Sequence, residues 1–226
     1  MKIGVLLSGC GVYDGVEIQE AILTLLAIKE IGADYVCIGI DADQFHVINH
    51  LTGETMDESR NMLVEAARIA RGEIKNIKDI APADIDALII PGGFGSAKNL
   101  TNWAFEGPTG TILPEVKLLL VNLINVGKPI AALCVSPIVV AKALEGSGIK
   151  SSMTIGTDKE PSPYTITDFT NGLSQLAVTP VMKTIKEIEI DTVNKIVTAP
   201  CYMMEASILE IHSNIRLAVA ALRDLI

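Results

Sequence analysis

Short apolar runs alternate with helical patterns along most of this chain, and this alternation constrains the fold more than any other feature. The runs are rich in β-branched residues and lie at Ile3–Leu7, Tyr35–Ile40, Ala87–Ile90, Pro129–Leu133 and Lys195–Thr198. Helical spacing of apolar residues lies at Glu17–Ile31, Met62–Ala70, Leu113–Val126, Val135–Leu144 and Met204–Leu225. Alternation of this kind predicts an α/β fold, with a mostly parallel sheet between helical layers.

The chain has 226 residues, a length that suits one large α/β domain. It contains no internal repeat, low-complexity tract or linker, so we expect a single domain over residues 1–226. The polar, irregular regions 41–60 and 156–179 are predicted to be surface insertions of that domain rather than boundaries.

Charge and hydropathy exclude two classes of partner. The formal net charge is −9, and no run of Lys or Arg appears. Nucleic acids and anionic membranes are bound by clustered positive charge, so neither is expected as a partner. No stretch approaches the roughly 18 apolar residues of a membrane-spanning helix.

The four cysteines, Cys10, Cys37, Cys134 and Cys201, are scattered singly and form no CxxC pair. This spacing argues against a zinc site and against a compact disulfide framework. Reduced thiols are the usual state in the cytosol, so we expect a cytoplasmic protein.

Cys134 falls where the run ending at Leu133 gives way to the helical pattern beginning at Val135. Side chains at such a junction face the cleft outside the carboxyl ends of the strands, where α/β sheets bind ligands. A helix N-terminus also lowers the pKa of a cysteine. The position alone leaves two interpretations open, a packed strand end and a reactive nucleophile.

Two other stretches are expected on the same edge of the sheet. Gly92 and Gly93 follow a buried run, and glycines there let backbone N–H groups face a cleft and stabilise an oxyanion. Glu17 and Glu20 begin the first helix, where acidic residues usually complement the helix dipole. A carboxyl group beside a cysteine would either donate a hydrogen bond to the thiolate or move protons on a substrate.

Nucleotide-binding motifs fail on spacing. After Gly9 and Gly11 the next glycine is Gly15, one position too late for a dinucleotide fingerprint, and Lys98 lacks the neighbours of a Walker loop.

Histidines are few. His50 lies in the 41–60 insertion, from which it could contact substrate, but no histidine follows Cys134, so a Cys–His–Glu triad is poorly supported.

Three stretches together resemble the ThiJ/PfpI superfamily, which is related to the class I glutamine amidotransferases. They are Gly15-Val-Glu-Ile-Gln-Glu20, Ile89-Ile-Pro-Gly-Gly93 and Ala131-Ala-Leu-Cys-Val-Ser-Pro137. Nearly the whole chain is similar to the ElbB family of bacterial glyoxalase-like proteins, named for an association with isoprenoid biosynthesis. That similarity lies in Ser8-Gly-Cys-Gly-Val-Tyr-Asp-Gly15, Asn49-His-Leu-Thr-Gly-Glu54, Pro91-Gly-Gly-Phe-Gly-Ser-Ala-Lys-Asn99, Thr154-Ile-Gly-Thr-Asp158 and Lys195-Ile-Val-Thr-Ala-Pro200.

The resemblance implies a flavodoxin-like three-layer sandwich, a homodimer and a cysteine nucleophile at Cys134. Counting to Gly32 places the family's helix-borne glutamate at Glu20 rather than Glu17. The oxyanion donors would be the backbone N–H groups of Gly93, of Val135 and also of Gly92. This chain departs from the broader pattern because Val135 stands where relatives with protease or amidase activity have histidine.

The activity that the resemblance implies is of glyoxalase type, a lyase reaction that converts glyoxal or methylglyoxal to a 2-hydroxy acid without glutathione. It requires neither a metal nor an organic cofactor, and its partner is a small aldehyde. Two alternatives stay open. One is hydrolysis of an amide or glycated amine on the same cysteine, and the other is a redox-sensing or chaperone-like protein whose cysteine is oxidised.

Overall fold

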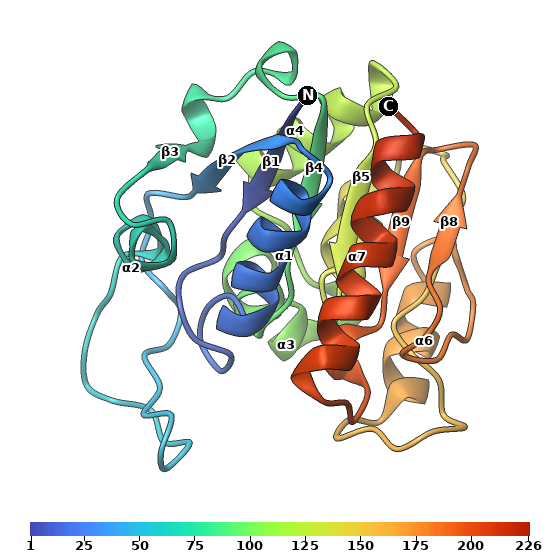
Figure 1. The fold of residues 1–226 in the computed structure, drawn as a ribbon. Coiled ribbons are helices and arrows are strands. Elements are labelled where there is room, and N and C mark those ends of the chain that lie inside the picture. The colour runs from blue at the N-terminus through green and yellow to red at the C-terminus, as the bar shows by residue number, and fades with distance from the viewer.

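The computed structural model describes residues 1–226 and is built on a seven-stranded sheet (Figure 1). The strands lie in the order β3-β2-β1-β4-β5-β9-β8. Their bounds are β1 Lys2–Leu6, β2 Asp34–Gly39, β3 Ile74–Asn76, β4 Ala87–Ile90, β5 Ile130–Leu133, β8 Glu189–Asp191 and β9 Ile196–Ala199. Every neighbouring pair is parallel except β8 and β9. The prediction of a mostly parallel α/β sheet is confirmed.

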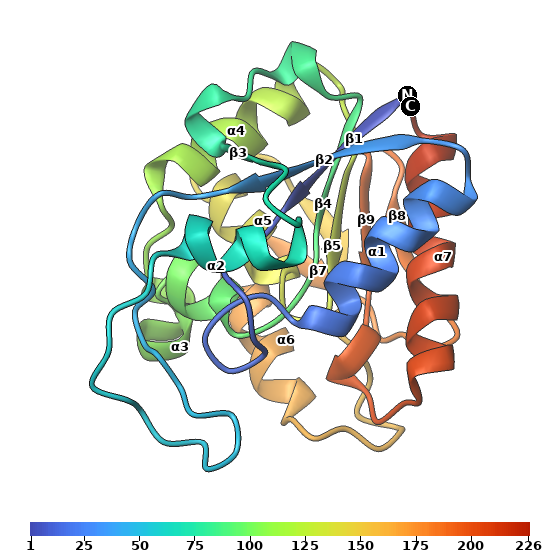
Figure 2. The same ribbon diagram turned by 60° about the vertical axis from the view of Figure 1, so that its left-hand side comes forward.

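Helices cover both faces of the sheet, which gives the predicted three layers. Helices α1 (Ile18–Glu30) and α7 (Ile208–Asp224) lie side by side on one face, and α4 (Pro114–Asn125) and α5 (Pro137–Leu144) pack together on the other (Figure 2). Helix α2 (Met62–Ile69) packs against β2 and β3. All residues of β4, β5 and β9 are buried, as a strand covered on both faces requires.

Several helices and strands are not predicted from the sequence. They are β3, β8, the parallel pair β6 (Ser151–Met153) and β7 (Val178–Pro180), the short helix α3 (Trp103–Glu106), helix α6 (Ile166–Ser174) and the π-helical turn Ser96–Leu100. Strands of three residues are too short to show a period. Helix α6 corrects the expectation that 156–179 is irregular, because it buries Ile166 and Leu173 and lays Gly172 against Trp103.

Two predicted helices begin later than expected. Helix α7 starts at Ile208 because Ser207 caps it, accepting a hydrogen bond from the Glu210 N–H, and the preceding residues Cys201–Met203 form a separate 3-10 turn. Helix α5 starts at Pro137, so residues 134–136 form the turn between β5 and the helix.

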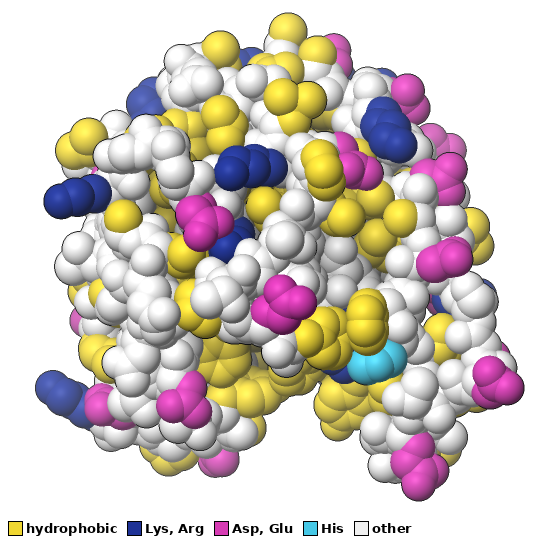
Figure 3. All heavy atoms as spheres, turned by 180° about the vertical axis from the view of Figure 1, so that it is seen from behind, with side chains coloured by type: hydrophobic (Ala, Val, Ile, Leu, Met, Phe, Trp, Pro, Cys, Tyr) yellow, Lys and Arg dark blue, Asp and Glu magenta, His cyan; other side chains and the backbone are white.

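The strand order changes direction between β1 and β4, and the loops that follow β1, β4, β5 and β9 meet at the carboxyl edge of the sheet. This is where ligands of open α/β sheets bind. At the same end of the molecule, Figure 3 shows a hollow between two lobes, with hydrophobic side chains along it. No helix is both long enough and apolar enough to cross a membrane.

Candidate active site at the carboxyl edge of the sheet

Cys134 occupies a sharp turn directly after β5. Its φ is +57°, a left-handed conformation that is rare for residues other than glycine and is found at strained functional positions. The Cys134 N–H donates to the Ala199 carbonyl at 2.9 Å, and the Ser136 N–H donates to the Leu133 carbonyl at 2.9 Å. These bonds hold the turn closed and leave the side chain at the edge of the sheet.

Ser136 ties this turn to the loop after β4. Its hydroxyl donates to the Pro91 carbonyl at 2.7 Å and lies 2.8 Å from the hydroxyl of Ser96. Both hydroxyls are fully buried. The serine thus fixes the distance between the cysteine and the two glycines that follow Pro91.

Gly92 and Gly93 lie where no larger residue fits, the first against the cysteine and the second against the start of α1. A Cβ on Gly92 would lie 2.4 Å from the Cys134 Cβ, and one on Gly93, whose φ is +100°, would lie 2.3 Å from the Glu17 nitrogen. Gly93 and Val135 line the same cavity as Cys134, and their backbone N–H groups lower the pKa of its thiol. The Gly92 N–H, by contrast, donates to the Glu20 Oε2 and is not free to serve an oxyanion.

Glu20 is the carboxyl group that meets the cysteine. It is completely buried, and its Oε2 accepts from the Gly92 N–H at 2.8 Å while its Oε1 accepts from the Tyr202 N–H at 3.1 Å. The Cys134 sulfur lies beside this carboxylate, since a Cβ on Gly92 would lie 2.8 Å from the sulfur and 2.6 Å from the Glu20 Oε2. Burial, and then the charge of Glu17, raise the pKa of Glu20 to about 8.

The cysteine is not the low-pKa thiol that its place before a helix predicts. Complete burial and the neighbouring Glu20 carboxylate raise the pKa of Cys134 well above its usual range, although the N–H groups of Gly93 and Val135 pull it down. The Glu20 contribution vanishes when that carboxyl is protonated. The two groups therefore titrate as a coupled pair. The Cys134 thiol ionises more easily when Glu20 is protonated than when Glu20 is ionised.

Glu17 has a different place. It caps α1, with its Oε2 accepting from the Glu20 N–H at 2.6 Å, while its own N–H donates to the Gly92 carbonyl at 2.9 Å. It is half-buried and does not line the cavity beside Cys134. Its influence on the site is electrostatic, through the pKa of Glu20.

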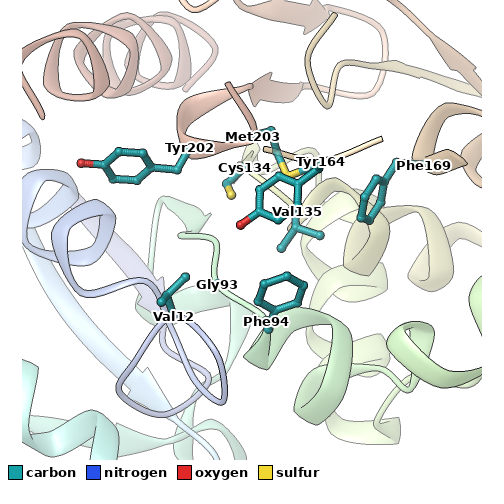
Figure 4. Close-up of a pocket in the computed structure, with 9 residues that line it drawn as sticks. All are labelled: Val12, Gly93, Phe94, Cys134, Val135, Tyr164, Phe169, Tyr202 and Met203. Carbon is teal, nitrogen blue, oxygen red and sulfur yellow. The ribbon is translucent and has the colours of Figure 1, made fainter. Parts of the chain in front are cut away.

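The thiol opens into a small, mostly apolar cavity of about 20 Å³ (Figure 4). The lining residues are Val12, Gly93, Phe94, Cys134, Val135, Tyr164, Phe169, Tyr202 and Met203. A more open hollow of about 390 Å³ adjoins it and shares Phe94 and Phe169. Most of these lining residues were not predicted as site residues from the sequence. They come from loops and from α6, and none of them belongs to a residue type and spacing that indicates catalysis.

His50 does not line this cavity. Its Nε2 accepts from the Tyr13 N–H at 3.2 Å, its Nδ1 lies 3.0 Å from the Ile48 carbonyl, and its ring stacks on that of Tyr13. Asp14 completes the contact by accepting from the Ile48 N–H at 2.7 Å. The 41–60 insertion supplies no cavity residue but braces the loop that carries Val12.

The remaining candidate groups are placed apart from the Cys134 thiol or serve packing. His46 packs edge-on against Phe45, and His212 lies beside Glu30 on the α1–α7 face. Cys201 is buried, and its thiol lies 3.6 Å from the Asn214 Oδ1. All four cysteines are free, and no cluster of three or more His, Cys, Asp or Glu side chains is placed to bind a metal.

Sequence comparison relates the whole chain to a group of curated proteins, although no protein-family model matches it. A protein from Homo sapiens named glutamine amidotransferase-like class 1 domain-containing protein 3, mitochondrial, is 38% identical over 228 residues, which cover 99% of this chain and 83% of the human one. The chain belongs to this glutamine amidotransferase-like class 1 family. A relative from Rattus norvegicus, named ES1 protein homolog, mitochondrial, is also 38% identical over 228 residues, covering 99% of this chain and 84% of its own.

Solved structures confirm the fold of this family. A crystal structure from Ehrlichia chaffeensis, described as an isoprenoid biosynthesis protein with an amidotransferase-like domain, has a TM-score of 0.89 at 33% identity and covers 100% of this chain and 99% of its own. Glyoxalase III from Candida albicans has a TM-score of 0.61 at 15% identity, over 100% of this chain and 95% of its own. At that identity the second likeness concerns the fold alone.

The comparisons overturn the expectation of a cytoplasmic protein. The relatives from human, rat and Danio rerio are all named as mitochondrial proteins. Unpaired cysteines are compatible with any reducing compartment, so the spacing that suggested the cytosol does not distinguish it from another one.

Proposed function

We propose that this protein is a glyoxalase-like enzyme that converts a short 2-oxoaldehyde, such as glyoxal or methylglyoxal, to a 2-hydroxy acid without glutathione. The observation that carries the proposal is the contact between a buried thiol, Cys134, and a buried carboxyl, Glu20, whose pKa is raised to about 8. A carboxyl with such a pKa can both take and return a proton near neutral pH.

The first step forms a carbon–sulfur bond. The ionised Glu20 takes the thiol proton, and the Cys134 sulfur attacks the aldehyde carbon while the π pair of that carbonyl moves to its oxygen. The N–H groups of Gly93 and Val135, which belong to residues that line the cavity beside the thiol, stabilise this oxyanion. The oxyanion then takes the proton back from Glu20 to give a hemithioacetal.

The second stage moves hydrogen between the two carbons. Glu20 removes the proton from the former aldehyde carbon, a carbon–carbon double bond forms, and the second carbonyl oxygen takes up a proton to give an enediol. Glu20 next protonates the second carbon, and the first oxygen releases its proton to leave a thioester on Cys134. Water attacks the thioester, the carbon–sulfur bond breaks, and the 2-hydroxy acid and the thiol are released.

The cavity and the fold relatives support this substrate class. A small space with mostly apolar walls favours a short, uncharged dicarbonyl over a long or charged substrate. The protein named glyoxalase III shares the fold, and the structure described as an isoprenoid biosynthesis protein matches the whole chain. We therefore also propose that the chain is of the ElbB type within its family.

The alternatives draw less support from the site. Amide hydrolysis of the cysteine–histidine kind needs a histidine beside the thiol, and none of the three histidines lines the cavity. Oxidative sensing needs a thiol that ionises readily, whereas burial and the neighbouring Glu20 carboxylate raise the pKa of Cys134.

The test is turnover of glyoxal and methylglyoxal by purified protein, followed by NMR detection of glycolate and lactate. We expect Cys134→Ala to abolish turnover and Cys10→Ala, which removes a thiol that does not line the cavity, to leave it unchanged. Equal turnover by the wild type and Cys134→Ala would sink the proposal.

A further inference from the structure

We propose that the Tyr164 hydroxyl is a further catalytic group, which donates to the second carbonyl oxygen of a 2-oxoaldehyde bound to Cys134. The inference rests on the proposed function, because it assigns a role within that reaction. It concerns a residue that no motif marks, in the 156–179 region that the sequence presents only as a polar insertion.

Tyr164 faces the reactive thiol across the cavity. Both residues line the same small space, and Figure 4 shows the tyrosine hydroxyl pointing into its centre, toward the side on which Cys134 lies. The ring is half-buried and meets Phe94 edge-on, with ring centroids 5.9 Å apart. The backbone is held because the Tyr164 N–H donates to the Ser162 hydroxyl at 3.0 Å, which in turn donates to the Met203 carbonyl at 2.6 Å.

The hydroxyl is free to serve a ligand. No side chain or backbone group of the protein hydrogen-bonds to it, in contrast to Tyr202, whose hydroxyl donates to the side chain of Gln19 and points away from the cavity. Burial, and then the charges of Cys134 and Glu20, raise the pKa of Tyr164 to about 12, so the group keeps its proton at neutral pH. It is the one side-chain O–H donor of the lining without a partner.

The chemistry of a 2-oxoaldehyde calls for two sets of donors. The N–H groups of Gly93 and Val135 serve the oxygen on the carbon that bonds to sulfur. When Glu20 removes the proton from that carbon, the π pair of the second carbonyl moves to the second oxygen, which lies one bond farther from the sulfur. The Tyr164 hydroxyl stabilises this developing charge by a hydrogen bond and supplies the proton that makes the enediol. The tyrosinate regains a proton when the first oxygen releases its own.

The test compares Tyr164→Phe, which deletes only the hydroxyl, with the matched change Tyr13→Phe, which deletes a hydroxyl outside the cavity lining. We expect Tyr164→Phe to lower the kcat for methylglyoxal at least about 100-fold, as the loss of one oxyanion donor typically does. The rate of Cys134 alkylation by iodoacetamide and the melting temperature should stay near the wild-type values, and Tyr13→Phe should match the wild type in all three.

A second measurement does not depend on turnover. Intact-mass titration of proteins that carry Glu20→Gln, which stops turnover, gives the adduct affinity of Cys134 for methylglyoxal and for acetaldehyde, which lacks the second carbonyl. We expect Tyr164→Phe to weaken only the methylglyoxal adduct, by roughly tenfold, the loss of one hydrogen bond. Equal weakening of both, or of neither, would overturn the role of Tyr164. A wild type that binds methylglyoxal but never forms lactate would instead overturn the proposed function.

Discussion

At the scale of single residues, the site depends on a carboxyl group that the fold keeps out of water. Glu20 is fully buried, and its two oxygens accept from the backbone N–H groups of Gly92 and Tyr202. No positively charged side chain is paired with the Glu20 carboxylate, so the neutral form of the carboxyl is favoured in the folded protein. A group held in this way makes folding depend on pH in a direction opposite to that of a salt-bridged carboxylate.

This dependence gives a prediction for stability. The pKa of Glu20 is raised from 4.5 to about 8 on folding, so between these pH values the folded state binds more protons than the unfolded state. The stabilising contribution is therefore complete below about pH 4.5 and is lost as the pH rises to about 8, at up to about 1.4 kcal/mol per pH unit.

Urea unfolding between pH 5 and pH 8 measures this loss of stability. We expect the unfolding free energy of Glu20→Gln, which cannot ionise, to fall less steeply with pH than that of the wild type. Parallel curves for the two proteins would show that Glu20 is already ionised in the fold. Glu210→Gln is the matched control, because that exposed cap has a lowered pKa and its loss leaves the Glu20 transition in place.

At the scale of elements, the site is a meeting of loops from four strands, held together by short polar contacts. Ser136 joins the turn after β5 to the loop after β4, and His50 and Asp14 join the 41–60 insertion to the loop after β1. The insertion is therefore a brace for the cavity wall that carries Val12. Asp14 is almost fully buried, whereas Tyr13 and His50 are exposed, so the brace runs from the interior to the surface.

His50→Ala tests the brace. The substitution removes the acceptor of the Tyr13 N–H and the ring that stacks on Tyr13, so we expect faster hydrogen–deuterium exchange in residues 8–15 and 41–60. Exchange in β4 and β5 should not change. Leu51→Ala, at a position 97% exposed in the same insertion, serves as the control. Unchanged exchange at Tyr13 in His50→Ala would contradict the bracing role.

The sequence predicts the central strands and long helices well, because their apolar spacing reflects burial between two layers. It also places Cys134, Gly92 and Glu20 on one edge, since the carboxyl ends of parallel strands must share it. The walls of the cavity could not be predicted in this way. Tyr164 and Phe169 are brought in by α6 and the loop before it, and the raised pKa of the thiol depends on a burial that no local pattern encodes.

At the scale of the whole molecule, the helical face opposite to α4 and α5 carries an apolar stripe. Ile18, Ile22 and Leu26 on α1 are 44%, 45% and 46% exposed, and Ile208 and Leu209 at the start of α7 extend this surface. Residues four apart on a helix share one side, and exposed apolar patches of this kind mark interaction surfaces. The homodimer stays a prediction, and this stripe is the surface on which we expect it to form.

In the proposed reaction the Cys134 thiol bonds the aldehyde, and the Glu20 carboxyl then moves the proton between its carbons. The most direct test is a reaction of Glu20→Gln with methylglyoxal, followed at once by intact mass and by NMR. We predict that this variant forms the covalent adduct on Cys134 more slowly than the wild type, because no carboxylate takes the thiol proton, and that it releases no lactate, whereas the wild type releases lactate. Lactate formation by Glu20→Gln at the wild-type rate would contradict the account.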